Sequence, residues 1–223
     1  MEQKLMKHID LLMERYPVLE CCKNDIIDAF DLLDDTYSKE GKMKRWYTRE
    51  WTDHEVVKNN GADAEHMVGE LMKGFKISRK LLSNEVDNLQ KIDPDMGEVL
   101  AENLQGALPA ITLEGHPALF TAYMNDCDPL LCFAQQVNGL GKQGDVLFGI
   151  STSGTSKNVL YAAVTAKSKG MKVVGLTGAK DSKLSALADT CIQVPETETY
   201  MVQELHLPVY HCLCLMLEEK FFG

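Results

Sequence analysis

Residues 144–163 read GDVLFGISTSGTSKNVLYAA, and this stretch decides the fold. Within it, Asp145–Ile150 is an apolar run that predicts a buried strand. The hydroxyl-rich segment Ser151–Ser156 follows directly, and residues 156–169 then predict a helix that ends at Gly170. A strand that enters a helix through a short polar loop is typical of a parallel α/β sheet.

The chain from residue 61 onward repeats this alternation of strands and helices. Further strands are predicted at residues 110–113, 172–177 and 190–194. Further helices are predicted at residues 64–75 (with Asp63 as N-cap), 96–107, 117–124, 129–139, 182–188 and 201–222. The strands are apolar throughout, which indicates that helices cover both faces of the sheet. We therefore predict an α/β fold: a three-layer αβα sandwich around a parallel sheet of about five strands.

The first 38 residues precede this pattern and have a different organisation. Two helices are predicted at residues 5–16 and 24–38, separated at Pro17. Both helices carry wide apolar faces, so residues 1–38 are expected to form a helical hairpin. The hairpin packs either on the core or, as those faces favour, in an oligomer interface. Residues 39–223 then form the main domain.

Composition excludes several classes of protein. The formal net charge of -10 disfavours a direct nucleic-acid partner, because the phosphate backbone repels an acidic surface. The seven cysteines are odd in number and form no CxxC pair, which disfavours a disulfide framework or a zinc knuckle. No apolar run is long enough for a signal peptide or a membrane span. We expect a cytoplasmic protein with no membrane partner.

The segment Ser151–Ser156 is the strongest candidate for a binding site. Every position except Gly154 carries a hydroxyl, whereas an ordinary helix N-cap needs only one. The first N–H groups of the following helix and its dipole favour an anion, and glycine permits close backbone approach. Neither a Gly-Lys-Ser/Thr ending nor GxGxxG is present, so no nucleotide cofactor is predicted. The segment therefore predicts a phosphate site at the carboxyl end of a strand.

A second candidate site lies on the helix that starts near residue 63. His66 and Glu70 are four residues apart and share one helix face. An imidazole and a carboxylate at this spacing form either a zinc half-site or an ordinary ion pair, and the spacing alone leaves both readings open.

The last helix carries two more polar residues, Gln203 and His211. Eight residues place them roughly 80° apart around a straight helix, and Glu204 would align better with His211. Either Pro208 distorts the helix or Gln203 lies at its entry turn. His206 competes with His211 as a candidate acid, and a buried core histidine is the structural alternative for His211.

Five segments together resemble the SIS (sugar isomerase) domain family, and within it the phosphoheptose isomerases. The resemblance covers roughly residues 60–220. The segments are GDVLFGISTSGTSKNVLYAA (144–163), KVVGLTG (172–178), DAEHMVGEL (63–71), Asn125-Asp126 before FAQQV (133–137), and QELHL (203–207) with His211.

This resemblance implies an aldose–ketose isomerase that acts on a sugar phosphate such as sedoheptulose 7-phosphate. It implies Glu70 as base and His211 as acid, in a homotetramer with active sites between subunits. Zinc, where present, is held by His66, Glu70, Gln203 and His211. The implied substrate contacts are Asn125, Asp126, Ser151, Thr152, Ser153, Ser156 and Gln203, and we add Asn60 from its position before the active-site helix.

The chain departs from the family at one loop. Phosphoheptose isomerases carry a glycine-rich GNGGS loop before the active-site helix, whereas Val57–Asn60 reads VKNN after the polar stretch 41–56. Arg49-Glu50-Trp51 can be encoded CGG-GAA-TGG, which read one base later gives Gly-Asn-Gly. A frame-shifted remnant of the loop and a codon coincidence both remain open, and sequencing codons 40–62 distinguishes them.

The altered loop keeps alternative functions open. A non-catalytic SIS protein that senses a sugar phosphate or bridges partners would need the phosphate site but not the glycine loop. An aminosugar-phosphate isomerase or deaminase fits the phosphate loop but fits the His66/Glu70 helix less well.

Overall fold

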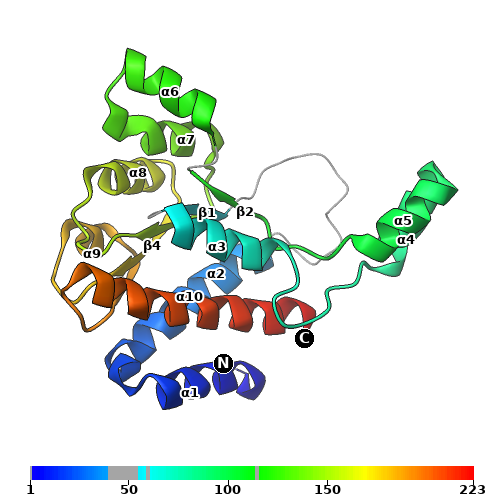
Figure 1. The fold of residues 1–223 in the computed structure, drawn as a ribbon, viewed down its shortest axis with the longest axis horizontal. Coiled ribbons are helices and arrows are strands. Elements are labelled where there is room, and N and C mark those ends of the chain that lie inside the picture. The colour runs from blue at the N-terminus through cyan, green and yellow to red at the C-terminus, as the bar shows by residue number, and fades with distance from the viewer. Residues whose placement is uncertain (1, 40–54, 59–60, 114–115) are drawn as a thin grey trace.

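A parallel sheet forms the centre of the protein in a computed structural model, which describes residues 2–39, 55–58, 61–113 and 116–223 (Figure 1). The strand order is β2-β1-β3-β4-β5, and every neighbouring pair is parallel. The strands are β1 (Glu55–Lys58), β2 (Ala110–Thr112), β3 (Val146–Ile150), β4 (Lys172–Thr177) and β5 (Thr190–Gln193). The predicted α/β class is confirmed.

Helices connect and flank these strands. The α-helices are α1 (Gln3–Arg15), α2 (Lys23–Lys39), α3 (Gly61–Met72), α4 (Ser83–Ile92), α5 (Pro94–Asn103), α6 (Pro117–Asp126), α7 (Cys132–Leu140), α8 (Lys157–Ser168), α9 (Lys183–Leu187) and α10 (Thr199–Phe222). Two 3-10 helices, η1 (Pro17–Cys22) and η2 (Pro129–Leu131), precede α2 and α7.

The central strand β3 divides the core into two apolar layers. Its alternate residues Val146, Phe148 and Ile150 join one cluster with buried side chains of α1, α2, α3 and α10. Leu147 joins a second cluster with buried side chains of α7, α8 and α9. Alternation along a strand sends neighbouring side chains to opposite faces, so helices cover both sides of the sheet.

The N-terminal hairpin has no core of its own. Buried side chains of α1 and α2, such as Ile9 and Phe30, belong to the same cluster as β3 and α10. Helix α1 lies along α10, and α2 packs on β5 and also contacts β3 and α10. The hairpin is therefore part of one face of the sandwich.

Three local features differ from what the sequence pattern predicted. Helix α3 begins at Gly61, so Asp63 lies in its first turn and is not the N-cap. The polar stretch before it contains strand β1, which the pattern did not predict. Pairing with β2 on one side and β3 on the other supplies the backbone hydrogen bonds that stabilise so polar a segment as a strand. Residues 83–92, for which the pattern predicted no element, form α4.

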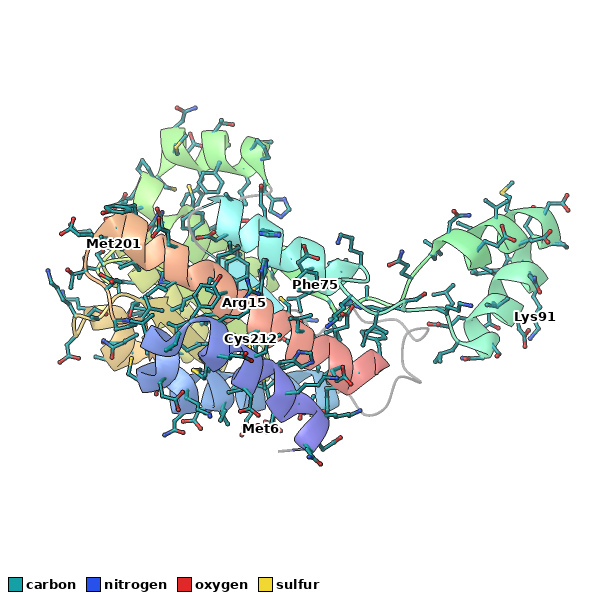
Figure 2. The ribbon with its side chains drawn as sticks, turned by 60° about the horizontal axis from the view of Figure 1, so that its bottom comes forward. Met6, Arg15, Phe75, Lys91, Met201 and Cys212 are labelled. Atoms are coloured by element: carbon teal, nitrogen blue, oxygen red, sulfur yellow. The ribbon has the colours of Figure 1, made fainter. Side chains whose placement is uncertain are left out.

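Helices α4 and α5 form an arm that stands away from the sandwich (Figure 1), and Lys91 marks it in Figure 2. None of the residues of α4 is buried, and in α5 only Gly97 is. Large apolar side chains on and beside the arm are exposed, among them Ile92, Met96 and Val99. Among the described residues, no helix has the length and apolarity needed to cross a bilayer.

Candidate active site

The predicted phosphate loop leaves the carboxyl end of β3 and enters α8. The N–H of Ser151 donates to the Leu176 carbonyl at 2.9 Å, which ties the start of the loop to β4. The Ser151 hydroxyl donates to Ser156 Oγ at 3.1 Å, and the N–H of Gly154 donates to Ser151 Oγ at 3.2 Å. Ser156 is the N-cap of α8, yet its side chain makes no capping bond. The N-terminus of α8 therefore keeps donors available for an anion.

Gly154 allows the loop to fold this tightly. Its φ is +62°, in the left-handed region that glycine adopts without steric cost. A Cβ at this position would overlap the side chain of Ser182, and the Gly154 carbonyl accepts from the N–H of Leu184 at 3.0 Å. The loop is thus packed against the start of α9, which holds its hydroxyls in place.

A second cluster joins α3 to α10 across the chain. His66 Nε2 lies 3.2 Å from Glu70 Oε1, as the four-residue spacing predicted. The imidazoles of His66 and His211 meet edge to face with centroids 5.0 Å apart. The Phe75 ring also packs against the His211 imidazole, with ring centroids 5.3 Å apart. Residues 145 positions apart in the sequence are therefore brought into one site.

Burial affects the protonation of His211 in this cluster. Burial lowers the pKa of His211, the neighbouring His66 lowers it further, and Glu70 opposes the change. The Nε2 atom of His211 is buried and has no hydrogen-bond partner among the described residues. Glu70 is nearly buried and accepts a hydrogen bond from Lys73 Nζ at 3.0 Å. His211 is consequently a neutral imidazole with a free nitrogen beside an anchored carboxylate.

Tyr210 and Asp63 extend the cluster. The Tyr210 hydroxyl lies 3.1 Å from His66 Nδ1 and 3.5 Å from Asp63 Oδ1. Burial and then the Asp63 charge raise the pKa of Tyr210, so its hydroxyl keeps its proton. Burial also raises the pKa of Asp63, and the Tyr210 hydroxyl and His66 oppose that rise. Tyr210 could not be identified from the sequence. Neighbouring residues on a helix point about 100° apart, so its position next to His211 does not indicate that both side chains face the same site.

A buried ion pair supports the end of α3. Arg79 and Glu218 are almost fully buried, and Arg79 Nε donates to Glu218 Oε1 at 2.9 Å. The guanidinium also donates to the backbone carbonyls of Glu70 and Leu71. These carbonyls belong to the last turn of α3, where intrahelical donors run out, and the Leu71 carbonyl also accepts from the N–H of Leu108 at 3.0 Å. Arg79, which sequence reasoning also missed, therefore fixes the backbone that carries the proposed base.

The phosphate loop and the starts of α3 and α10 lie toward the same edge of the sheet. Strand β1 ends at Lys58, in register with Gly149, and α3 starts three residues later. Helix α10 starts soon after β5 ends, at the edge where Ser151 follows β3. In Figure 1, α3 and α10 lie side by side over one face of the sheet. This is the edge at which open α/β sheets bind ligands.

A groove of about 320 Å³ between α1 and α10 also reaches His211. His8, Arg15 and Phe75 line it, and Arg15 and Phe75 are labelled near α10 in Figure 2. A larger hollow of about 470 Å³ is lined by aspartates at the opposite, amino edge of the sheet, where an anion would be repelled.

Other predicted site residues are not joined to the cluster. Asn125 and Asp126 are exposed in the last turn of α6, so they do not form the loop expected for them. Gln203 lies in the second turn of a continuous α10 and not at its entry. His206 is fully buried, and burial lowers its pKa to about 4, so it is a core histidine and not a competing acid. Asn60 lies outside the described residues.

The side chains near His66 have the chemistry of a zinc site. Two imidazoles and a carboxylate are usual zinc ligands, and the unpartnered Nε2 of His211 is a free donor atom. In the described parts of the chain, no three His, Cys, Asp or Glu side chains already converge around a single point. The donor set therefore fits zinc in composition, although it is not arranged as a closed coordination shell.

Comparison with known proteins places the chain in a family. A family model described as the SIS domain matches residues 90–178. The chain is 38% identical over 162 residues to a phosphoheptose isomerase of a Nitratiruptor species, an alignment that covers 73% of each chain. It is 36% identical to one from Geotalea daltonii, with 75% of each chain covered. The chain belongs to the phosphoheptose isomerase family.

Solved structures agree with this family assignment. Phosphoheptose isomerases from Neisseria gonorrhoeae and Francisella tularensis match at 25% identity, with TM-scores of 0.67 and 0.68. The first match covers 97% of both chains and the second covers 96% of both. The phosphoheptose isomerase fold therefore extends over the N-terminal hairpin as well as the SIS domain.

Proposed function

We propose that this chain is a phosphoheptose isomerase, an aldose–ketose isomerase that acts on a sugar phosphate such as sedoheptulose 7-phosphate. The observation that carries the proposal is the meeting of His66, which pairs with Glu70, and His211 from two distant helices, in a chain that also carries a hydroxyl-rich loop at a helix N-terminus. Family membership supports the same activity.

The isomerisation moves one proton between carbons and one between oxygens. Glu70 takes the proton from the carbon beside the carbonyl, which leaves an enediol, and returns it to the neighbouring carbon. The anchoring of Glu70 by His66 and Lys73 fixes the direction of its carboxylate. His211 donates a proton to one oxygen and accepts the proton of the other. Its lowered pKa keeps it neutral at pH 7, so it exchanges protons in both directions.

The phosphate would bind Ser151, Thr152, Ser153 and Ser156 through hydroxyls and through N–H groups at the start of α8. Asn60, Asn125, Asp126 and Gln203 are proposed contacts to the sugar. Gln203 is well placed for this because the second turn of α10 lies at the edge of the sheet that carries the phosphate loop.

We further propose zinc as the metal, held by His66, Glu70, His211 and Gln203. When bound, zinc would polarise the sugar carbonyl. The supporting observation is the free His211 nitrogen beside two further donors. Metal analysis of the purified protein, with anomalous scattering at the zinc edge, tests this; a fully active protein without any metal contradicts it.

A homo-oligomer, specifically a tetramer, is the proposed assembly, in the cytoplasm. The exposed apolar side chains of the α4–α5 arm support it, because such side chains on a projecting element usually meet a partner. Light scattering after gel filtration measures the mass, and a monomer at micromolar concentration would exclude the tetramer.

A non-catalytic sugar-phosphate sensor remains the second candidate. The absence of glycine from Val57–Asn60, where the family's glycine loop stands, favours it. Such a protein would be stabilised by sugar phosphates without converting them.

The deciding experiment follows sedoheptulose 7-phosphate by NMR with wild type, Glu70→Gln and Glu65→Gln. Glu65 is exposed on α3 and serves as the matched control. We expect turnover by wild type and the control and none by Glu70→Gln. A folded wild type that binds the sugar phosphate but never converts it refutes the enzyme and leaves the sensor.

A further inference from the structure

A chain of polar contacts runs through the site from Asp63 to Glu70. Asp63 Oδ1 lies 3.5 Å from the Tyr210 hydroxyl, the hydroxyl lies 3.1 Å from His66 Nδ1, and His66 Nε2 lies 3.2 Å from Glu70 Oε1. Tyr210 is almost fully buried in α10, whereas His66 is exposed at the site. The hydroxyl of the buried Tyr210 thus contacts the imidazole of the exposed His66.

Proton counting allows two arrangements of these bonds. The Tyr210 hydroxyl has one proton, which it donates either to the Asp63 carboxylate or to His66 Nδ1. A bond to an ionised acceptor is roughly twice as strong as one to a neutral acceptor, which favours donation to Asp63. The hydroxyl then accepts from His66, and His66 Nδ1 carries the imidazole proton.

We propose that Asp63 and Tyr210 are positioning residues that hold His66 in its Nδ1–H tautomer and leave its Nε2 lone pair facing Glu70. A lone pair and a carboxylate oxygen 3.2 Å apart need a cation between them. This cation is a shared proton or the proposed metal. Ligating histidines commonly donate their second N–H to a protein acceptor in this way. The inference deepens the proposed function and rests on it for its catalytic consequence.

The alternative arrangement has a different signature. If Tyr210 donates to Nδ1, the Nε2 atom carries the proton and donates to Glu70, and the imidazole has no lone pair for a metal. The two arrangements put the proton on different nitrogens of His66, so they are distinguishable without any turnover.

The test measures the side-chain ¹⁵N shifts of His66 in full-length protein, with the signal assigned by its loss in His66→Asn. We expect Nδ1–H in wild type and loss of this preference in Tyr210→Phe and Asp63→Asn. Tyr161→Phe, a partly exposed tyrosine on α8, is the control and should match wild type. Wild type with the proton on Nε2 overturns the proposal.

Catalytic activity and zinc affinity give a second test of the proposal. Tyr210→Phe should lower kcat about 10–100-fold with KM unchanged, and weaken binding of zinc alone by a similar factor in chelator competition. A folded Tyr210→Phe with wild-type kcat and wild-type zinc affinity overturns the proposal; if that variant does not fold, Asp63→Asn decides by the same criteria. Wild type that shows the Nδ1–H tautomer but no turnover removes the proposed function and leaves the tautomer assignment intact.

Discussion

Replacing Glu218 with glutamine should destabilise the protein more than any surface change of the same kind. The Glu218 carboxylate accepts from Arg79 Nε and from the N–H groups of Phe75, Lys76 and Ile77 at 2.7–3.2 Å. Glutamine keeps the shape and one acceptor oxygen, but its amide nitrogen then faces N–H donors. The charge of Arg79 is left buried without a counterion.

The magnitude follows from this burial. Breaking a buried pair by removing one partner costs about 3–5 kcal/mol, against about 0–1 kcal/mol for an exposed pair. For a chain of this size each kcal/mol shifts the melting temperature by about 2–4 °C, so we expect a fall of about 6–20 °C. Because Arg79 also binds the Glu70 carbonyl, kcat should fall even where the variant remains folded.

Urea unfolding followed by circular dichroism measures the free energy, and Glu219→Gln is the matched control. Glu219 is the next residue and pairs with the exposed Lys7, so its loss should cost less than about 1 kcal/mol. The double variant Arg79→Met with Glu218→Leu removes the unpaired charge but leaves the three N–H groups without their acceptor, so it should recover only part of the loss. A Glu218→Gln protein within about 1 kcal/mol of wild type would show that the reasoning about Arg79 is wrong.

Two further predictions concern the phosphate loop and the core. Gly154→Ala should abolish thermal stabilisation by sugar phosphate, because Gly154 has a positive φ and a Cβ there would overlap Ser182. Gly139→Ala, at an open position of a helix, is the control and should retain the stabilisation. If both variants retain it, this loop is not the phosphate site. The folded pKa of His206 is about 4 against 6.5 unfolded, so its contribution to stability is complete above pH 6.5 and is lost as the pH falls toward 4, by about 3 kcal/mol. His206→Asn should flatten that part of the pH dependence of unfolding, and an unchanged slope would contradict the assignment.

Much of the fold was predictable because its signals are local. The apolar run of β3, the hydroxyl loop and the start of α8 lie within twenty consecutive residues, and their pattern predicted strand, turn and helix. Strand β1 could not be predicted this way, since its stability comes from neighbours on both sides in the sheet. The start of α3 was misplaced by three residues for a related reason: the helix begins at Gly61, close to the end of β1 at Lys58.

The candidate site also combines features that the sequence predicted with features that only the tertiary structure shows. The pairing of His66 with Glu70 follows from helix geometry, and the sequence by itself determined it, together with the hydroxyl-rich loop between β3 and α8. Only the tertiary structure decided that His211 meets this pair, that His206 is buried, and that Tyr210 contacts His66. These outcomes depend on how α10 is rotated against α3 and the sheet. That rotation is set by packing among residues more than a hundred positions apart, which no local period encodes.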